Sequence, residues 1–229
     1  MPNIRVRGTS FREGFEGLAN PENRCAINCR KHGGSELKTL RGKQVTEGVS
    51  REQALGKLSG EGEDYELLEG TIFDRPCRFF KNGPKTLREL YEQNLSDETF
   101  IVYEHERLSY RETYEMAARV AQMMISEYDI AAGDRVAISM RNFPEWIIAF
   151  CATTSIGGIA VAMNSLWNSE EMAYGLSDSG AKLLFADEER LDRLRQVSQS
   201  IDSKVIAVRA NNQTEYPDLA ELLNKYEST

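Results

Sequence analysis

Four short apolar runs in the second half of the chain constrain its fold more than any other feature. They read VAISM, IAVAM, KLLFA and KVIAV and begin at residues 136, 159, 182 and 204. Apolar runs without polar alternation are typical of strands buried on both faces of a sheet. Helical patterns separate the runs, and this alternation at short spacing is typical of βαβ units. The sequence therefore predicts an α/β fold, with a mostly parallel sheet and helices on both faces.

Capping patterns predict where several helices begin. Ser109 and Glu112 form a capping box that opens a helix reaching about Tyr128. Asn142 is the expected cap of the following helix, with Pro144 in its first turn, where no amide donor is needed. Further helices are expected over residues 86–91, 169–180, 188–201 and 218–226. A hairpin of residues 100–103 and 108–110 is expected before Ser109.

Apolar residues between positions 110 and 128 recur at helical spacing, which predicts an amphipathic helix with one buried face. We expect that face to consist of Tyr114, Ala117, Ala118, Ala121, Met124, Ile125 and Tyr128.

The first 83 residues differ from the rest of the chain in composition. They hold 12 of the 17 glycines and show little apolar periodicity. Such a segment buries too little apolar area to offset the entropy of ordering it. We therefore expect residues 1–50 to be a flexible, poorly ordered extension and residues 51–83 a partly ordered lead-in. Residues 84–229 are expected to form the folded α/β portion.

Within the lead-in, the sequence predicts a short helix followed by a hairpin. The helix is expected over residues 50–58. Strands are expected over residues 65–68 and 71–80, joined near Gly70, because glycine favours turns.

Charge and rare residues exclude several classes of function. Lys plus Arg number 28 and Asp plus Glu 36, so the net charge is −8 and nucleic acid is a poor candidate partner. Two histidines leave little material for a multi-histidine metal site. Four cysteines and a start without an apolar stretch favour a reducing compartment, so we expect a cytoplasmic protein.

Four local patterns admit a functional interpretation, and in each case a structural one is favoured. Residues 146–169 carry no charge and could suggest a transmembrane helix, but a buried helix followed by a buried strand fits better. Residues 153–158 (TTSIGG) resemble a phosphate loop, yet their glycines close a helix and no lysine follows. The acidic run 187–189 suits a helix start rather than acid–base chemistry. Cys25, Cys29 and His32 lack a common zinc spacing, so no metal site is expected.

The order of motifs resembles one known family. The segments LSYRETYEMAARVAQMM and AAGDRVAISMRNFPEWIIAFCATTSIGGIAVAMNSLWNSEEMAYGLSDSGAKLLFAD resemble the N-terminal part of AMP-forming acyl-CoA synthetases, which are adenylate-forming enzymes. Each motif is weak alone, but their order over about 120 residues is specific. The resemblance implies that a carboxylic acid and Mg-ATP give an acyl-adenylate, which CoA then captures. Residues 51–95 resemble the lead-in of a branch acting on fatty or other bulky acids.

The sequence also departs from the family pattern. The family's Thr/Ser/Gly-rich phosphate loop, adenine-binding aromatic segment, ribose-binding aspartate and catalytic lysine lie downstream of the matching region and are missing here. We therefore expect no catalytic residue, and no complete hold on ATP, Mg or CoA, in this chain alone. The resemblance implies one candidate, Lys182, for contact with a CoA phosphate; the alternative is a solvated lysine. Gly175 stands where the acetate branch carries arginine.

Three interpretations remain open at this point. The leading one is the N-terminal segment of an acyl-CoA ligase, inactive alone. The second is a truncated interaction module of the same fold, and the third is an unrelated doubly wound nucleotide-binding domain, which the absence of G-x-G-x-x-G disfavours. If a partner half is absent, an apolar face or an unpaired strand edge predicts self-association or pairing with the missing part.

Overall fold

A computed structural model describes residues 5–6, 48–72, 74–197, 201–211 and 214–226. The chain divides into two compact units. Of the described residues, one unit holds 5–6 and those from 85 to 226, and the other holds those from 48 to 84. Most of the expected flexible extension, and the candidate metal ligands Cys25, Cys29 and His32, lie outside the described residues.

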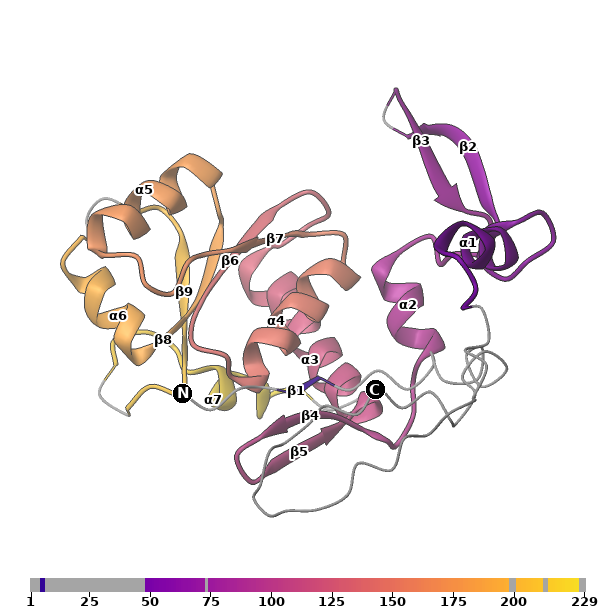
Figure 1. The fold of residues 1–229 in the computed structure, drawn as a ribbon. Coiled ribbons are helices and arrows are strands. Elements are labelled where there is room, and N and C mark those ends of the chain that lie inside the picture. The colour runs from indigo at the N-terminus through magenta and orange to yellow at the C-terminus, as the bar shows by residue number, and fades with distance from the viewer. Residues whose placement is uncertain (1–4, 7–47, 73, 198–200, 212–213, 227–229) are drawn as a thin grey trace, which may run out of the picture. The chain divides into compact units, whose positions relative to one another are not determined.

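A four-stranded parallel sheet organises the larger unit (Figure 1). Its strands are β6 (Arg135–Ser139), β7 (Ile159–Ala162), β8 (Leu183–Asp187) and β9 (Lys204–Val208). They lie in the order β7-β6-β8-β9, and every neighbouring pair is parallel. The four apolar runs of the sequence are these four strands, so the predicted parallel sheet is confirmed.

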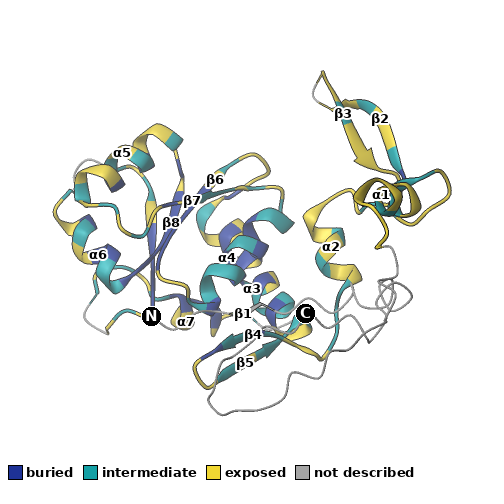
Figure 2. Ribbon diagram, viewed as in Figure 1, coloured by how far each residue is buried: buried dark blue, intermediate teal, exposed yellow. Residues whose placement is uncertain are grey.

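Helices cover both faces of this sheet because successive strand residues point to opposite sides. Val136 and Ile138 belong to one apolar core, and Ala137 between them belongs to the other. Figure 2 shows the central strands as buried between these layers. The helices of the first core are α3 (Tyr110–Tyr128), α4 (Pro144–Ser155) and α7 (Leu219–Leu223), and those of the second are α5 (Ser169–Ser179) and α6 (Glu188–Arg195).

A helix and a small antiparallel sheet precede α3 in this unit. The helix α2 spans Leu87–Gln93, and β4 (Thr99–Tyr103) and β5 (Glu106–Ser109) form the predicted hairpin. A two-residue strand, β1 (Arg5–Val6), pairs antiparallel with β4. The sequence did not predict β1, because two residues carry no periodicity.

Helix α3 begins as predicted, but its buried face is rotated from the expected one. The Ser109 hydroxyl accepts the Glu112 amide at 3.1 Å, and the Glu112 carboxylate accepts the Ser109 amide at 2.7 Å. Val120 and Met123 are fully buried, whereas Ile125, expected on the apolar face, is 51% exposed. The packing of α3 against α4 decides which arc of the helix is covered.

The start of α4 corrects a second expectation. Its N-cap is Phe143, not Asn142, and no side chain caps the helix, although Pro144 occupies the first turn as predicted. The Phe143 ring packs edge-on against Tyr103 at a centroid distance of 5.7 Å. This tertiary contact places Phe143 at the cap position. By contrast, Asn168 caps α5 in a full capping box with Glu171, as expected.

The smaller unit contains the predicted helix and hairpin, with the turn in a different place. Helix α1 (Arg51–Ser59) follows a Ser50 cap, and β2 (Leu67–Ile72) pairs with β3 (Arg75–Phe80). Gly70 lies inside β2, opposite Cys77, and the turn contains Asp74 at φ 60°. A Cβ at Gly70 would come within 2.7 Å of the Phe79 ring. The glycine therefore allows close packing across the hairpin rather than a turn.

One further boundary differs from expectation. Helix α6 ends at Arg195 instead of reaching residue 201, and residues 198–200 lie outside the described part. The uncharged stretch 146–169 forms a helix followed by a strand, as predicted. The strand β7 is not buried as expected, because it lies at the edge of the sheet. Among the described residues, no helix is long and apolar enough to cross a membrane.

Candidate functional site

The carboxyl ends of β6 and β8 mark the place where this fold can form a ligand site. The two strands are parallel neighbours, so both end at the same edge of the sheet. β6 leads into α4 on one face, and β8 leads into α6 on the other. A crevice forms where adjacent strands send their connections in opposite directions, and open α/β sheets bind ligands there.

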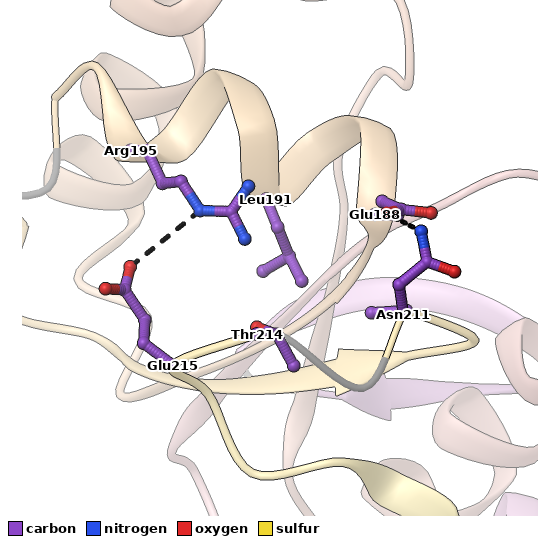
Figure 3. Close-up of a pocket in the computed structure, with 7 residues that line it drawn as sticks. Glu188, Leu191, Arg195, Asn211, Thr214 and Glu215 are labelled. Atoms are coloured by element: carbon purple, nitrogen blue, oxygen red, sulfur yellow. Dashed lines mark hydrogen bonds and ion pairs between the residues drawn. The ribbon is translucent and has the colours of Figure 1, made fainter.

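A cavity of about 360 Å³ lies at this edge. Its lining residues come from the segments that follow β6, β8 and β9: Arg141, Phe143, Asp187, Glu188, Glu189, Asp192 and Arg209. A second cavity, of about 300 Å³, shares Glu188 and lies between α6 and the segment after β9 (Figure 3). There Asn211 donates a hydrogen bond to Glu188, and Arg195 lies 4.0 Å from Glu215.

Asp187 connects the two strand ends. Its carboxylate caps α6 by accepting the Arg190 amide at 3.2 Å, and it also accepts the Arg141 amide at 2.8 Å. The Arg190 guanidinium lies 3.2 Å from the same carboxylate, and both side chains are almost completely buried. The acidic run 187–189 is therefore a helix cap, as the sequence predicted.

Two arginines of α6 hold the segment that follows β7. The Arg193 guanidinium donates to the carbonyl oxygens of Ser165 and Trp167 at 2.9 and 2.8 Å. Arg190 donates to the carbonyl of Ser165 as well. Both arginines also pair with Glu189. Buried carbonyl groups need such partners, so these contacts fix the loop between β7 and α5.

Arg209 closes the other side of the crevice from an unusual backbone position. Its φ of 50° lies in the left-handed region, which costs about 1–3 kcal/mol for a non-glycine residue. The guanidinium donates two hydrogen bonds of 2.8 Å to Glu106, and its Nε lies 2.9 Å from Glu145. Its Cζ atom lies 5.2 Å from the Tyr103 ring centroid and 5.3 Å from that of Phe143.

These contacts shift the ionisation of the paired groups. The hydrogen bonds from Arg209 lower the pKa of Glu106, and the hydrogen bond to Glu106 raises the pKa of Arg209. The hydrogen bond from Arg141 likewise lowers the pKa of Glu189. Both ion pairs favour the charged forms of their partners.

The charged groups of the crevice are thus engaged with one another. Arg141 and Arg209 are bonded to carboxylates, Glu188 accepts from Asn211, and Asp192 pairs with Arg195. A clamp for a triphosphate needs cationic or amide donors that are free to face the anion. The described residues of the crevice therefore do not fit ATP or its magnesium ion, and we derive no chemical step from them.

Lys182, the candidate for CoA contact, lies at the amino end of β8, whereas the crevice lies at the carboxyl ends of the strands. It immediately precedes β8, and its ammonium lies 2.7 Å from the Asp134 carboxylate, whose pKa the contact lowers. The structure therefore does not bring Lys182 to the crevice. Its role toward CoA stays a prediction.

The turn after α4 is not a phosphate loop. The amides of Gly157 and Gly158 donate to the carbonyls of Thr154 and Thr153 at 3.2 and 2.9 Å, so neither is free for an anion. Gly157 has a φ of 78°, which closes the helix as the sequence predicted. No group of three or more potential metal-binding side chains occurs among the described residues.

Gly175 also has a packing role. A Cβ at this position would lie 2.6 Å from the Trp167 ring, so the ring occupies the space that a longer side chain would need. Trp167 belongs to the loop that Arg193 holds.

Comparison with known proteins assigns this fold to a family. A model described as AMP-binding enzyme matches residues 89–228. The chain belongs to the AMP-binding enzyme family. The resemblance inferred from the sequence motifs is therefore confirmed.

The individual relatives of this chain are much longer than the region that matches it. It is 30% identical over 119 residues to N-(5-amino-5-carboxypentanoyl)-L-cysteinyl-D-valine synthase of Amycolatopsis lactamdurans, covering 51% of this chain and 3% of that protein. It is 31% identical over 88 residues to 2-succinylbenzoate–CoA ligase of Bacillus velezensis, covering 38% of this chain and 18% of that protein.

Among solved structures, the chain resembles a putative long-chain-fatty-acid CoA ligase from Rhodopseudomonas palustris. The TM-score is 0.54 at 26% identity, covering 60% of this chain and 36% of that one. The chain thus spans less than a fifth of these two curated relatives and about a third of the solved neighbour.

Sequence reasoning missed the arginine contacts of the crevice. The spacing of Asp187 with Arg190 and of Glu189 with Arg193 was a usable signal, because residues three or four apart face each other on a helix. The sequence held no comparable signal for the contact of Arg209 with Glu106, since Glu106 lies 103 positions earlier in the chain.

Proposed function

We propose that this chain is the N-terminal segment of an AMP-forming acyl-CoA ligase and that residues 84–229 form the first α/β portion of its large domain. The reaction joins a carboxylic acid to CoA with ATP. Adenylation gives the acid AMP as its leaving group, and the CoA thiolate then attacks the activated carbonyl. The observation that carries the proposal is the family match over residues 89–228 on a doubly wound sheet. Two of the relatives described above bear the names of CoA ligases.

The substrate class we propose is a fatty or other bulky carboxylic acid. ATP, magnesium and CoA would serve the whole protein, and this chain would hold none of them completely. This agrees with a crevice whose arginines are already bonded to carboxylates. A cytoplasmic location fits these cofactors and the free state of the described cysteines, Cys77 and Cys151.

Lys182 remains the proposed contact for a CoA phosphate. Its ammonium is about half exposed, and a CoA phosphate would have to displace Asp134 from it. Replacement by alanine in a longer protein containing this chain should raise the KM for CoA and leave acid-dependent pyrophosphate exchange unchanged.

A non-catalytic interaction module of the same fold is the second candidate. The paired charges of the crevice favour it, because they leave this chain without a described phosphate clamp. Such a module would act by binding the rest of the domain or another copy of itself.

Acid-dependent exchange of pyrophosphate into ATP separates the candidates. The isolated 229-residue chain should show only background exchange with fatty, aromatic or amino acids, because its described residues form no clamp for the phosphates of ATP. A longer protein that contains this chain and the downstream family motifs should form acyl-CoA from a fatty or aromatic acid. If that protein adenylates no acid, the ligase proposal fails and the interaction module stands.

A further inference from the structure

Strand β7 is an outer strand of the parallel sheet, and no described strand pairs with its outer edge. Among the described residues it pairs only with β6. The amides of Ile159 and Met163 donate to the carbonyls of Asp134 and Ile138 at 2.8 and 3.0 Å. In a parallel ladder, alternate residues bond to the same neighbour, so the N–H and C=O groups of Ala160 and Ala162 point away from the sheet.

The edge carries none of the features that usually block pairing. Natural edge strands are protected by charged side chains, prolines or bulges. Residues 159–169 contain no charged residue and no proline, and the β6–β7 register runs without a bulge. Ile159 is 46% exposed, and Ala162 is exposed as well. An extended chain can therefore reach the outward backbone groups.

Contacts at both ends hold this edge in the extended form. At its start, the amide of Gly158 donates to the carbonyl of Thr153 at 2.9 Å. After its end, Arg193 binds the carbonyls of Ser165 and Trp167. A strand fixed at both ends loses little conformational entropy when a second strand pairs with it.

We propose that β7 is a dimerisation edge and that its occupant is the β7 strand of a second copy of this chain. The two strands would run antiparallel around a two-fold axis at Val161, with Ala160 of each copy opposite Ala162 of the other. Each such pair exchanges two N–H···O bonds, so all outward groups of both alanines are satisfied. The arrangement joins two four-stranded sheets into one.

Symmetry and charge favour this occupant. The edge is complementary to itself, so the contact is isologous and closes after two copies. The seam contains no charged side chain, so no like charges face each other across it. The net charge of −8 on each copy acts at longer range, where salt screens it. This inference does not depend on the proposed ligase function.

Sedimentation equilibrium of the full chain tests the proposal. The mass should rise from 25.9 kDa toward twice that value at tens of micromolar protein, and more readily as salt rises from about 0.05 to 0.5 M. Ala162→Lys places like charges at the seam on an exposed position and should weaken dimerisation at least about tenfold. Ala160→Pro removes an outward N–H without touching the β6 bonds and should act in the same way.

Two controls keep the outcome decisive. Ile125→Lys changes an exposed apolar residue on α3 and should leave dimerisation unchanged. Circular dichroism should show that all variants are folded; if Ala160→Pro is not, Ala162→Lys alone decides. A wild-type chain that stays monomeric at about 100 µM overturns the proposal. So does a dimer that Ile125→Lys disrupts and Ala162→Lys leaves intact.

Amide exchange identifies the edge directly. The amides of Ala160 and Ala162 should exchange slowly only at concentrations where the dimer forms, whereas the Val161 amide should be slow at all concentrations. Protection of Ala160 and Ala162 in dilute monomer would mean that another segment of the chain occupies the edge, and would overturn the proposal.

Discussion

At the scale of single residues, Arg209 shows how one side chain joins three separate elements. It follows β9, bonds to Glu106 at the start of β5 and to Glu145 in α4, and lies beside two aromatic rings. Its left-handed backbone is an unfavourable conformation for arginine. The bonds and ring contacts therefore offset the backbone strain at Arg209. They also hold the β4–β5 hairpin against the parallel sheet.

We predict that Arg209→Ala lowers the free energy of unfolding by about 2 kcal/mol, because two carboxylates lose their partner at a partly buried site. Arg209→Gly should be less destabilising by about 1 kcal/mol, since glycine adopts a positive φ without strain. Urea denaturation of both variants measures the loss of unfolding free energy in each. Equal stability of the two would contradict the strain, and an alanine variant within about 0.5 kcal/mol of wild type would contradict the bonding role.

At the scale of elements, the helices of the larger unit begin in two ways. Helices α3 and α5 begin with complete capping boxes, in which side chains satisfy the first amides. Helix α4 begins at Phe143 without any side-chain cap, and its Pro144 leaves one donor fewer to satisfy. Tertiary packing of the Phe143 ring replaces the local cap.

Two asparagines at neighbouring helix starts give a matched test of this difference. Asn168→Ala should lower the free energy of unfolding by about 1 kcal/mol, because the Asn168 side chain accepts the Glu171 amide at 2.9 Å. Asn142→Ala should change it by less than about 0.5 kcal/mol, since Asn142 is not the cap. Chemical denaturation of the pair is the measurement. A larger loss for Asn142→Ala would restore the cap that the sequence predicted.

At the scale of the whole molecule, ion pairs connect elements that are distant in the sequence. The pKa of Glu106 is lowered by Arg209, that of Glu189 by Arg141 and that of Asp134 by Lys182. Each pair joins two different elements or the segments beside them, so acid should loosen the unit at several places together.

Stability should therefore fall in acid. A carboxyl group whose folded-state pKa lies below its unfolded value stabilises the protein above the unfolded value, and this contribution is lost as pH falls through the folded pKa. The ordinary values are 4.5 for glutamate and 3.8 for aspartate, so the melting temperature should drop from about pH 4.5 downward. Thermal melts between about pH 7 and 3 measure this, and the drop should be smaller in Arg209→Ala. A melting temperature that rises below pH 4.5 would contradict the assignment.

The sequence by itself determined the fold class, the family and the helix starts that carry a side-chain cap, such as those of α3 and α5. Apolar runs and capping boxes are local signals, and a strand such as Leu183–Asp187 or a cap such as Ser109 depends on residues within a few positions. The order of motifs between residues 108 and 187 was enough to indicate the family. The N-cap and the length of helix α3 were predicted correctly for the same reason.

Only the tertiary structure decided which surfaces meet. The cap of α4 shifted to Phe143 because a ring from β4 packs there, and the buried face of α3 turned toward Val120 because α4 covers it. The engagement of Arg209 with Glu106, and the contact of Lys182 with Asp134, follow from strand order. Strand order is a long-range property, because it joins residues that no local pattern relates.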